Sequence, residues 1–97
     1  MGFRWHWSWR LRALALDAYG AMVGLQNQKQ RAEQLLEESV ALFRVIGDDW
    51  GLAMALSDLA MWPLPMTAHG LAKRMVAIEE SMILARQVGD PLLLGTV

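Results

Sequence analysis

Two pairs of adjacent glutamates, Glu37-Glu38 and Glu79-Glu80, are the residues of this chain best suited to acid–base or metal chemistry. Paired carboxyl groups act as a catalytic acid and base only when both reach the reacting group. Adjacent side chains on a helix point about 100° apart, so neither pair converges on one substrate atom. We therefore interpret these glutamates as charged residues on a solvated helix surface.

The chain has two histidines, His6 and His69, and no cysteine. A metal site needs several nitrogen, oxygen or sulfur ligands at close spacing, and neither histidine has such neighbours in the sequence. The lack of cysteine excludes disulfides and thiolate zinc sites. No serine lies in a recognisable nucleophile motif, and the glycines form no phosphate-binding loop. We predict a protein that is not an enzyme, with no catalytic residue, no metal site and no cofactor.

The segment Trp5-His6-Trp7-Ser8-Trp9-Arg10 interleaves aromatic and basic residues. One interpretation is a patch that docks a partner protein, an anionic membrane surface or single-stranded nucleic acid. The other interpretation is structural. Trp5 and Trp9 lie one helical turn apart and would cap the end of a helix stack, or the segment is a leader. We favour the structural interpretation.

Composition limits the class of protein. The 97 residues allow one domain with a modest core, and a formal net charge of −1 argues against direct nucleic-acid binding. Hydrophobic residues make up 55%, yet no uncharged apolar stretch reaches the length of a transmembrane helix. The first twelve residues lack the uninterrupted apolar run of a secretory signal. We expect a cytoplasmic protein.

Apolar residues at helical spacing predict four helices and no strand, at about residues 9–25, 29–46, 49–62 and 70–88. Gly47 and Gly89 are expected to end helices in the left-handed conformation, and Asp48 to cap the next helix. Pro63 and Pro65 are expected to end the third helix. The first helix is expected to be buried on more than one side. The residues expected on the main apolar stripes are Leu11, Leu14, Ala15, Ala18, Met22 and Leu25 in the first helix, Ala32, Leu35, Leu36, Ser39, Val40, Phe43 and Ile46 in the second, and Ala77, Ile78, Ser81, Met82, Ala85 and Val88 in the fourth.

The sequence contains an internal repeat. Residues 37–48 return as residues 79–90 at an offset of 42, with seven of twelve positions identical. Upstream, residues 13–20 align with residues 53–60 at an offset of 40. The two extra residues of the second unit are placed in the connector of residues 61–70. A fixed period in this range indicates a repeat architecture in which each unit buries its apolar face against its neighbours.

The run from Leu35 to Arg44, followed by Ile46-Gly47-Asp48, resembles a tetratricopeptide repeat (TPR). It is most similar to the roughly forty-residue variety of bacterial signal-transduction ATPases and transcriptional regulators. The resemblance implies an all-α fold of two stacked antiparallel helix hairpins of an α-solenoid. It also implies a scaffold whose helix-lined surface accepts a partner protein or peptide.

These observations give a division into four parts: residues 1–10 as a Trp/Arg-rich leader or cap, 11–48 and 49–90 as two TPR-like units, and 91–97 as the start of a truncated third unit. The expected function is a non-catalytic protein–protein interaction module, a fragment of a larger bacterial regulatory or signalling protein. The alternative is a small helical protein that self-associates through exposed helix ends and has no dedicated ligand. Neither hypothesis includes direct nucleic-acid binding or a transmembrane segment.

Overall fold

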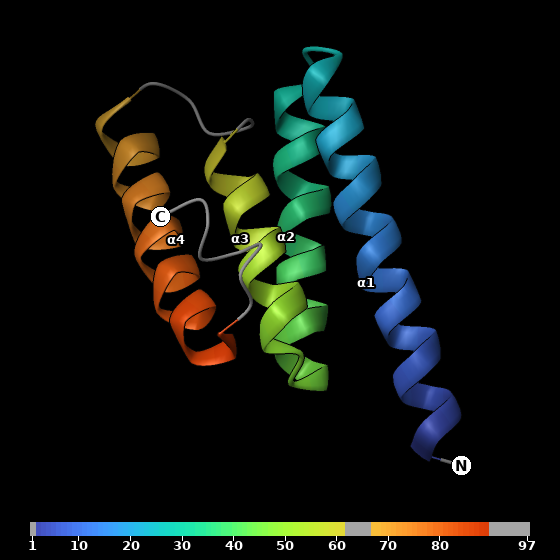
Figure 1. Ribbon diagram of the computed structural model, residues 1–97. Helices are drawn as coiled ribbons and strands as arrows, with labels where there is room; N and C mark the ends of the chain where they lie inside the picture. The colour runs from blue at the N-terminus through green and yellow to red at the C-terminus, as the bar shows by residue number, and fades with distance from the viewer. Residues whose placement is uncertain (1, 62–66, 90–97) are drawn as a thin grey trace.

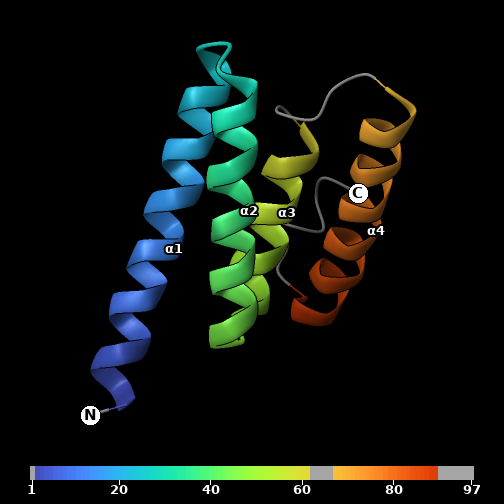
Figure 2. The same cartoon turned by 180° about the vertical axis from the view of Figure 1, so that it is seen from behind.

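The protein is all-α and consists of two packed helix pairs. The computed structural model describes residues 2–61 and 67–89, and for residues 2–7 it describes the backbone alone. The helices are α1 (Gly2–Leu25), α2 (Lys29–Ile46), α3 (Asp49–Met61) and α4 (Ala68–Val88). α1 packs along α2 and α3 along α4, and α3 joins the pairs by packing against α2 (Figure 1). As a result, α1 and α4 lie at the two outer edges, which is also clear from behind (Figure 2).

The helix boundaries confirm most of the sequence-based expectations. The second helix has the predicted bounds, and the third begins at the predicted Asp49. The first helix begins at Gly2, well before the expected start near residue 9, because no helix-breaking residue interrupts the segment that follows. α4 begins at Ala68, where the Thr67 hydroxyl caps the helix by accepting the Gly70 N–H at 3.0 Å. Pro63, Pro65 and the expected third unit at 91–97 lie outside the described residues.

The Gly-Asp signals have the predicted mechanical role. Gly47 and Gly89 follow α2 and α4 in the left-handed conformation, with φ of 73° and 70°. After Gly47, the Asp48 side chain accepts the Gly51 N–H at 3.0 Å and so caps α3. Each glycine ends a helix, and in the first unit the aspartate starts the next one.

The core forms where α2 meets α1 and α3. The predicted stripe of α2 is confirmed, since Leu36 and Phe43 are fully buried and Leu35 and Ile46 are half-buried. Phe43 packs against α3 at Gly51, where an added Cβ would lie closer than 3.0 Å to three ring atoms. The helices therefore meet closely because a large ring on one faces a glycine on the other. The buried apolar cluster comprises Ala13, Leu36, Val40, Phe43, Leu52, Ala53, Ala55, Leu56, Leu59, Ala60, Ala77 and Leu84.

The expectation for the buried face of α1 was wrong. Leu11, Met22 and Leu25 are 59%, 54% and 66% exposed, although they belong to the predicted apolar stripe. The buried face instead carries mostly small residues, because α1 lies close against α2. A Cβ at Gly20 would lie 2.8 Å from Leu36 Cγ. α1 is therefore buried on one side and leaves large apolar side chains exposed. The buried residues are Ala13, Asp17, Gly20, Val23 and Gly24.

The sequence repeat is also a repeat of one buried contact. The Ser39 hydroxyl of α2 donates to the Ala13 carbonyl of α1 at 2.8 Å. In the second pair, the Ser81 hydroxyl of α4 donates to the Ala53 carbonyl of α3 at 3.0 Å. The serines are 42 residues apart and the alanines 40, the two offsets of the alignment. The two helices of each pair are therefore joined by a buried hydrogen bond at equivalent positions.

Candidate functional site

An open groove of about 380 Å³ lies between α2 and α4, with α3 contributing to its floor. Its floor is apolar, and charged side chains stand at its rim. A concave, mostly apolar surface with a few polar groups at its edge is typical of ligand-binding grooves in proteins. The residues that line it are Glu37, Val40, Arg44, Leu56, Leu59, His69, Ala72, Lys73, Val76, Ala77 and Glu80.

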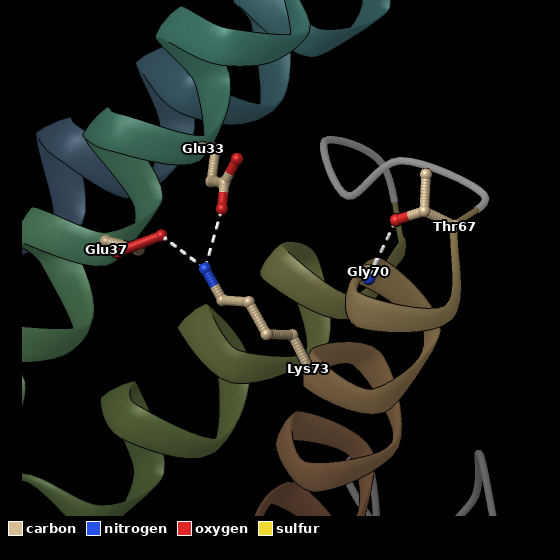
Figure 3. A network of polar contacts seen from close by, with 5 residues as sticks. All are labelled: Glu33, Glu37, Thr67, Gly70 and Lys73. Atoms are coloured by element: carbon tan, nitrogen blue, oxygen red, sulfur yellow. Dashed lines mark hydrogen bonds and ion pairs between the residues drawn. The ribbon is translucent and has the colours of Figure 1, made fainter.

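Lys73 joins α4 to α2 at one end of the groove. Its Nζ lies 2.7 Å from Glu33 Oε2 and 3.0 Å from Glu37 Oε1, so one ammonium group bridges two carboxylates (Figure 3). These hydrogen bonds favour the charged forms. The bond from Lys73 lowers the pKa of Glu33, and the bonds to Glu33 and Glu37 raise the pKa of Lys73.

Arg44 and Glu80 form the second connection between α2 and α4. The guanidinium donates two hydrogen bonds, of 2.5 and 2.7 Å, to the two carboxylate oxygens. This bidentate geometry fixes direction as well as distance. The hydrogen bonds lower the pKa of Glu80 and raise that of Arg44. The charges of this pair neutralise each other, so the rim here holds the helices together and presents no reactive group.

In each of the two adjacent glutamate pairs, one member forms an ion pair and the other does not take part in it. Glu38 and Glu79 are exposed, as expected of a solvated helix surface. Glu37 and Glu80 instead pair with basic residues of the opposite helix. The sequence did not indicate this division, because the basic partners lie 36 residues away in the chain.

A second polar site, missed by the sequence reasoning, joins α1 to α3. Asp17 is only 6% exposed, one of its oxygens is buried without a hydrogen-bond partner, and its side chain is hydrogen-bonded to Asp58. Burial first, and then the hydrogen bond and charge of Asp58, raise the pKa of Asp17 to about 8. The pair can hold one proton between two carboxyl groups. No signal in the sequence indicated this site, because the burial of Ala13 and Gly20, at helical spacing from Asp17, is known only from the structure.

The outer face of α4 carries exposed apolar residues in a row. Leu71, Met75 and Ile78 are 41%, 64% and 43% exposed and follow each other at spacings of four and three. Val88 is 37% exposed. Ile78 and Val88 were expected to be buried, and that expectation was wrong because α3 covers a neighbouring face of α4, at Ala77, Ser81 and Ala85.

Of the remaining candidates of the sequence analysis, only His69 is found at one of these sites among the residues whose side chains the structure describes. His69 is exposed at the rim of the groove, Trp9 is 37% exposed, and the side chains of Trp5 and Trp7 lie outside the described residues, as does that of His6. Within the described part of the chain, no three His, Cys, Asp or Glu side chains gather where they could hold a metal ion. None of the helices in that part has the length and apolarity needed to cross a membrane.

Comparisons with protein-family models, with curated proteins and with solved structures found no match to this chain. Functional inference therefore rests on the repeat, the groove and the exposed faces of the outer helices.

Proposed function

We propose that this protein is a non-catalytic protein–protein interaction module, a TPR-like scaffold that binds a helical segment of a partner protein. The observation that carries the proposal is the exposed row of Leu71, Met75 and Ile78 on α4. Apolar residues at alternating spacings of four and three form the seam by which one helix packs against another. An exposed seam of this kind is an interaction surface.

The groove beside α4 supports the same proposal. Val76 and Ala72 of α4 line it, together with Leu56 and Leu59 of α3, so α4 offers a second apolar surface on another side from the exposed row. The charged groups at the rim are already paired with each other. A partner would therefore bind mainly by burying apolar surface there, and it would leave few unpaired charges buried.

We further propose that the two helix pairs are two TPR-like repeat units. The repeat of the Ser39 and Ser81 contacts supports a two-unit TPR-like stack. By its resemblance to the forty-residue TPR variety, we assign it to a larger bacterial regulatory or signalling protein. We also assign it to the cytoplasm.

The proposal can be tested with a phage-displayed library of helical peptides selected on the immobilised 97-residue chain. Calorimetry then measures the Kd of enriched peptides for the wild type and for Ile78→Lys. We expect peptides with apolar residues at helical spacing, and a Kd raised at least about tenfold by the buried lysine. The matched control is Val45→Lys, at a position of α2 that is 73% exposed. Failure to enrich any peptide, or equal binding to Ile78→Lys, would contradict the proposal.

A further inference from the structure

Two apolar faces remain exposed at opposite edges of the stack. They lie on α1 and α4, the outermost helices (Figures 1 and 2). The exposed residues are Leu11, Tyr19 and Met22 on α1, at 59%, 43% and 54%, and Leu71, Met75 and Ile78 on α4, at 41%, 64% and 43%. Each face therefore offers apolar contact to a further helix.

The repeat specifies how such faces meet inside the chain. The equivalent bonds of Ser39 and Ser81 set the register: each position of α4 corresponds to one 42 residues earlier in α2. Each position of α3 likewise corresponds to one 40 residues earlier in α1. The contacts of α2 with α3 and α4 are therefore a template for contacts of α4 with the α1 and α2 of another copy.

The apolar residues of the template have suitable equivalents. Inside the chain, Val40 of α2 lies in one groove with Leu59 of α3. Their equivalents are Met82 of α4, which is half-buried, and Tyr19 of α1, which is 43% exposed. All four side chains have apolar bodies, so the outer surfaces can form the same kind of contact as the inner ones.

The residues equivalent to the first ion pair of the template carry the same charges as that pair. Arg44 of α2 binds Glu80 of α4 within the chain. One repeat along, Arg44 corresponds to Arg86 of α4, and Glu80 corresponds to Glu38 of α2. Arg86 and Glu38 are both exposed. A second copy stacked in the same register would bring its Glu38 to this Arg86.

The second ion pair follows the same rule. Lys73 of α4 binds two carboxylates of α2, of which Glu37 has a charged equivalent and Glu33 corresponds to the apolar Met75. The equivalents are Arg31 of α2 and Glu79 of α4, again basic and acidic, and both are exposed. Arg31 also lies 5.2 Å above the Tyr19 ring and donates to its hydroxyl at 2.6 Å. It therefore already lies beside the apolar face that it would flank at the junction.

We propose that the occupant of the α4 face is a second copy of this chain, whose α1–α2 pair stacks on α4 and repeats the junction between the two units. The docking rests on the function proposed above, because it names the partner of the same face. The two contacting surfaces are different, so the contact runs head to tail. When two copies have joined, the α1 face of one and the α4 face of the other are still exposed. Further copies can bind there, so assembly continues as an open row of copies.

The first test reverses the charges at the proposed junction. Sedimentation velocity over a concentration series would measure association of the full chain, Glu79→Lys, Arg31→Glu and the double variant. Each single reversal replaces attraction by repulsion, and we expect it to weaken association by about tenfold. The double variant restores opposite charges across the junction and should recover most of the association. The control is Gln87→Lys, because its equivalent in α2, Val45, is 73% exposed although the second unit packs on the first.

The second test measures which surfaces meet. The chain has no cysteine, so single cysteines can be introduced at chosen positions. A short bis-maleimide should link a mixture of Glu79→Cys and Arg31→Cys chains into heterodimers, with little linkage in either protein alone. A mixture of Gln87→Cys and Arg31→Cys should remain unlinked. Linkage of Glu79→Cys to itself would indicate a two-fold symmetric contact and would overturn the head-to-tail register.

The outcomes separate this proposal from the more general one. A chain that stays monomeric at every concentration overturns self-assembly. If such a monomer still binds the selected helical peptides through Ile78, the interaction module stands and its partner is another protein. Oligomers whose stability is unaffected by both charge reversals would also overturn the proposed junction. Recovery in the double variant is the result that a general loss of folding could not produce.

Discussion

The carboxyl groups of Asp17 in α1 and Asp58 in α3 are hydrogen-bonded, and this contact joins the first helix of one repeat unit to the first helix of the other. Asp17 is 6% exposed, and its burial, together with the hydrogen bond and charge of Asp58, raises its pKa from 3.8 to about 8. Two carboxyl groups in contact favour a state in which one of them keeps its proton. The joint between the two units therefore includes a group that titrates near neutral pH.

Stability should fall as the pH rises towards 8. Below pH 3.8, Asp17 is protonated in both the folded and the unfolded chain and has no effect on their balance. Between that value and about 8, the unfolded chain releases the proton and the folded chain keeps it, which favours unfolding. This group alone would lower the unfolding free energy by up to about 1.4 kcal/mol per pH unit. Urea unfolding followed by circular dichroism at a series of pH values measures the slope.

The variant Asp17→Asn should flatten this slope and stabilise the protein at pH 8, because the amide carries no charge and can still donate to Asp58. The matched control is Asp49→Asn, a change at an exposed position of α3 that should leave the slope intact. An unchanged slope in Asp17→Asn would show that Asp17 titrates at its ordinary pKa in the folded chain.

The two buried serines should contribute unequally. Ser39→Ala removes one hydrogen bond, to the Ala13 carbonyl, and should cost about 1 kcal/mol. Ser81→Ala removes the bond to Ala53 and also the contact with Ser57 at 2.7 Å, and should cost about twice as much. Chemical denaturation gives both values.

Ser8→Ala is the control for the serine variants, since Ser8 is exposed on α1 and the change should stay within about 0.5 kcal/mol of the wild type. Equal costs at positions 39 and 81 would mean that the Ser57 contact adds nothing.

Much of the fold could be predicted because its signals are local. The stripe of α2 and the glycines 47 and 89 depend on spacing and backbone conformation within a few residues. The buried face of α1 could not be predicted in the same way. Its large apolar residues suggested burial, yet Gly20 and Ala13 face α2. The two backbones lie so close together there that small side chains fit better than large ones.

The sites were harder to predict than the helices because they depend on which helices become neighbours. Glu37 and Lys73 are 36 residues apart in the chain, and only the stacking of α4 beside α2 brings them to 3.0 Å. The same holds for Asp17 and Asp58. Local patterns place such residues on faces but leave their partners open.

Gly51→Ala should destabilise the protein although alanine favours helices. The new Cβ would lie closer than 3.0 Å to the ring of Phe43, which is fully buried and has little room to move. We expect a loss of about 1–3 kcal/mol, measured as a lower urea midpoint. The double variant Gly51→Ala, Phe43→Leu removes the clash and should be less destabilised than the two single changes added together. Additive costs would show that Phe43 and Gly51 do not pack against each other.

The ion pair of Arg44 and Glu80 should stabilise the stack modestly and depend on salt. Both side chains are partly exposed, at 50% and 31%, so a double-mutant cycle with Arg44→Gln and Glu80→Gln should give a coupling free energy of about 0.5–1 kcal/mol. Because Arg44 lowers the pKa of Glu80, the contribution is present above pH 4.5 and is lost as the pH falls through the lowered value. Screening at high salt should reduce it. A coupling that is zero at low salt would mean that α2 and α4 are held together by Lys73 and the apolar floor of the groove without help from this pair.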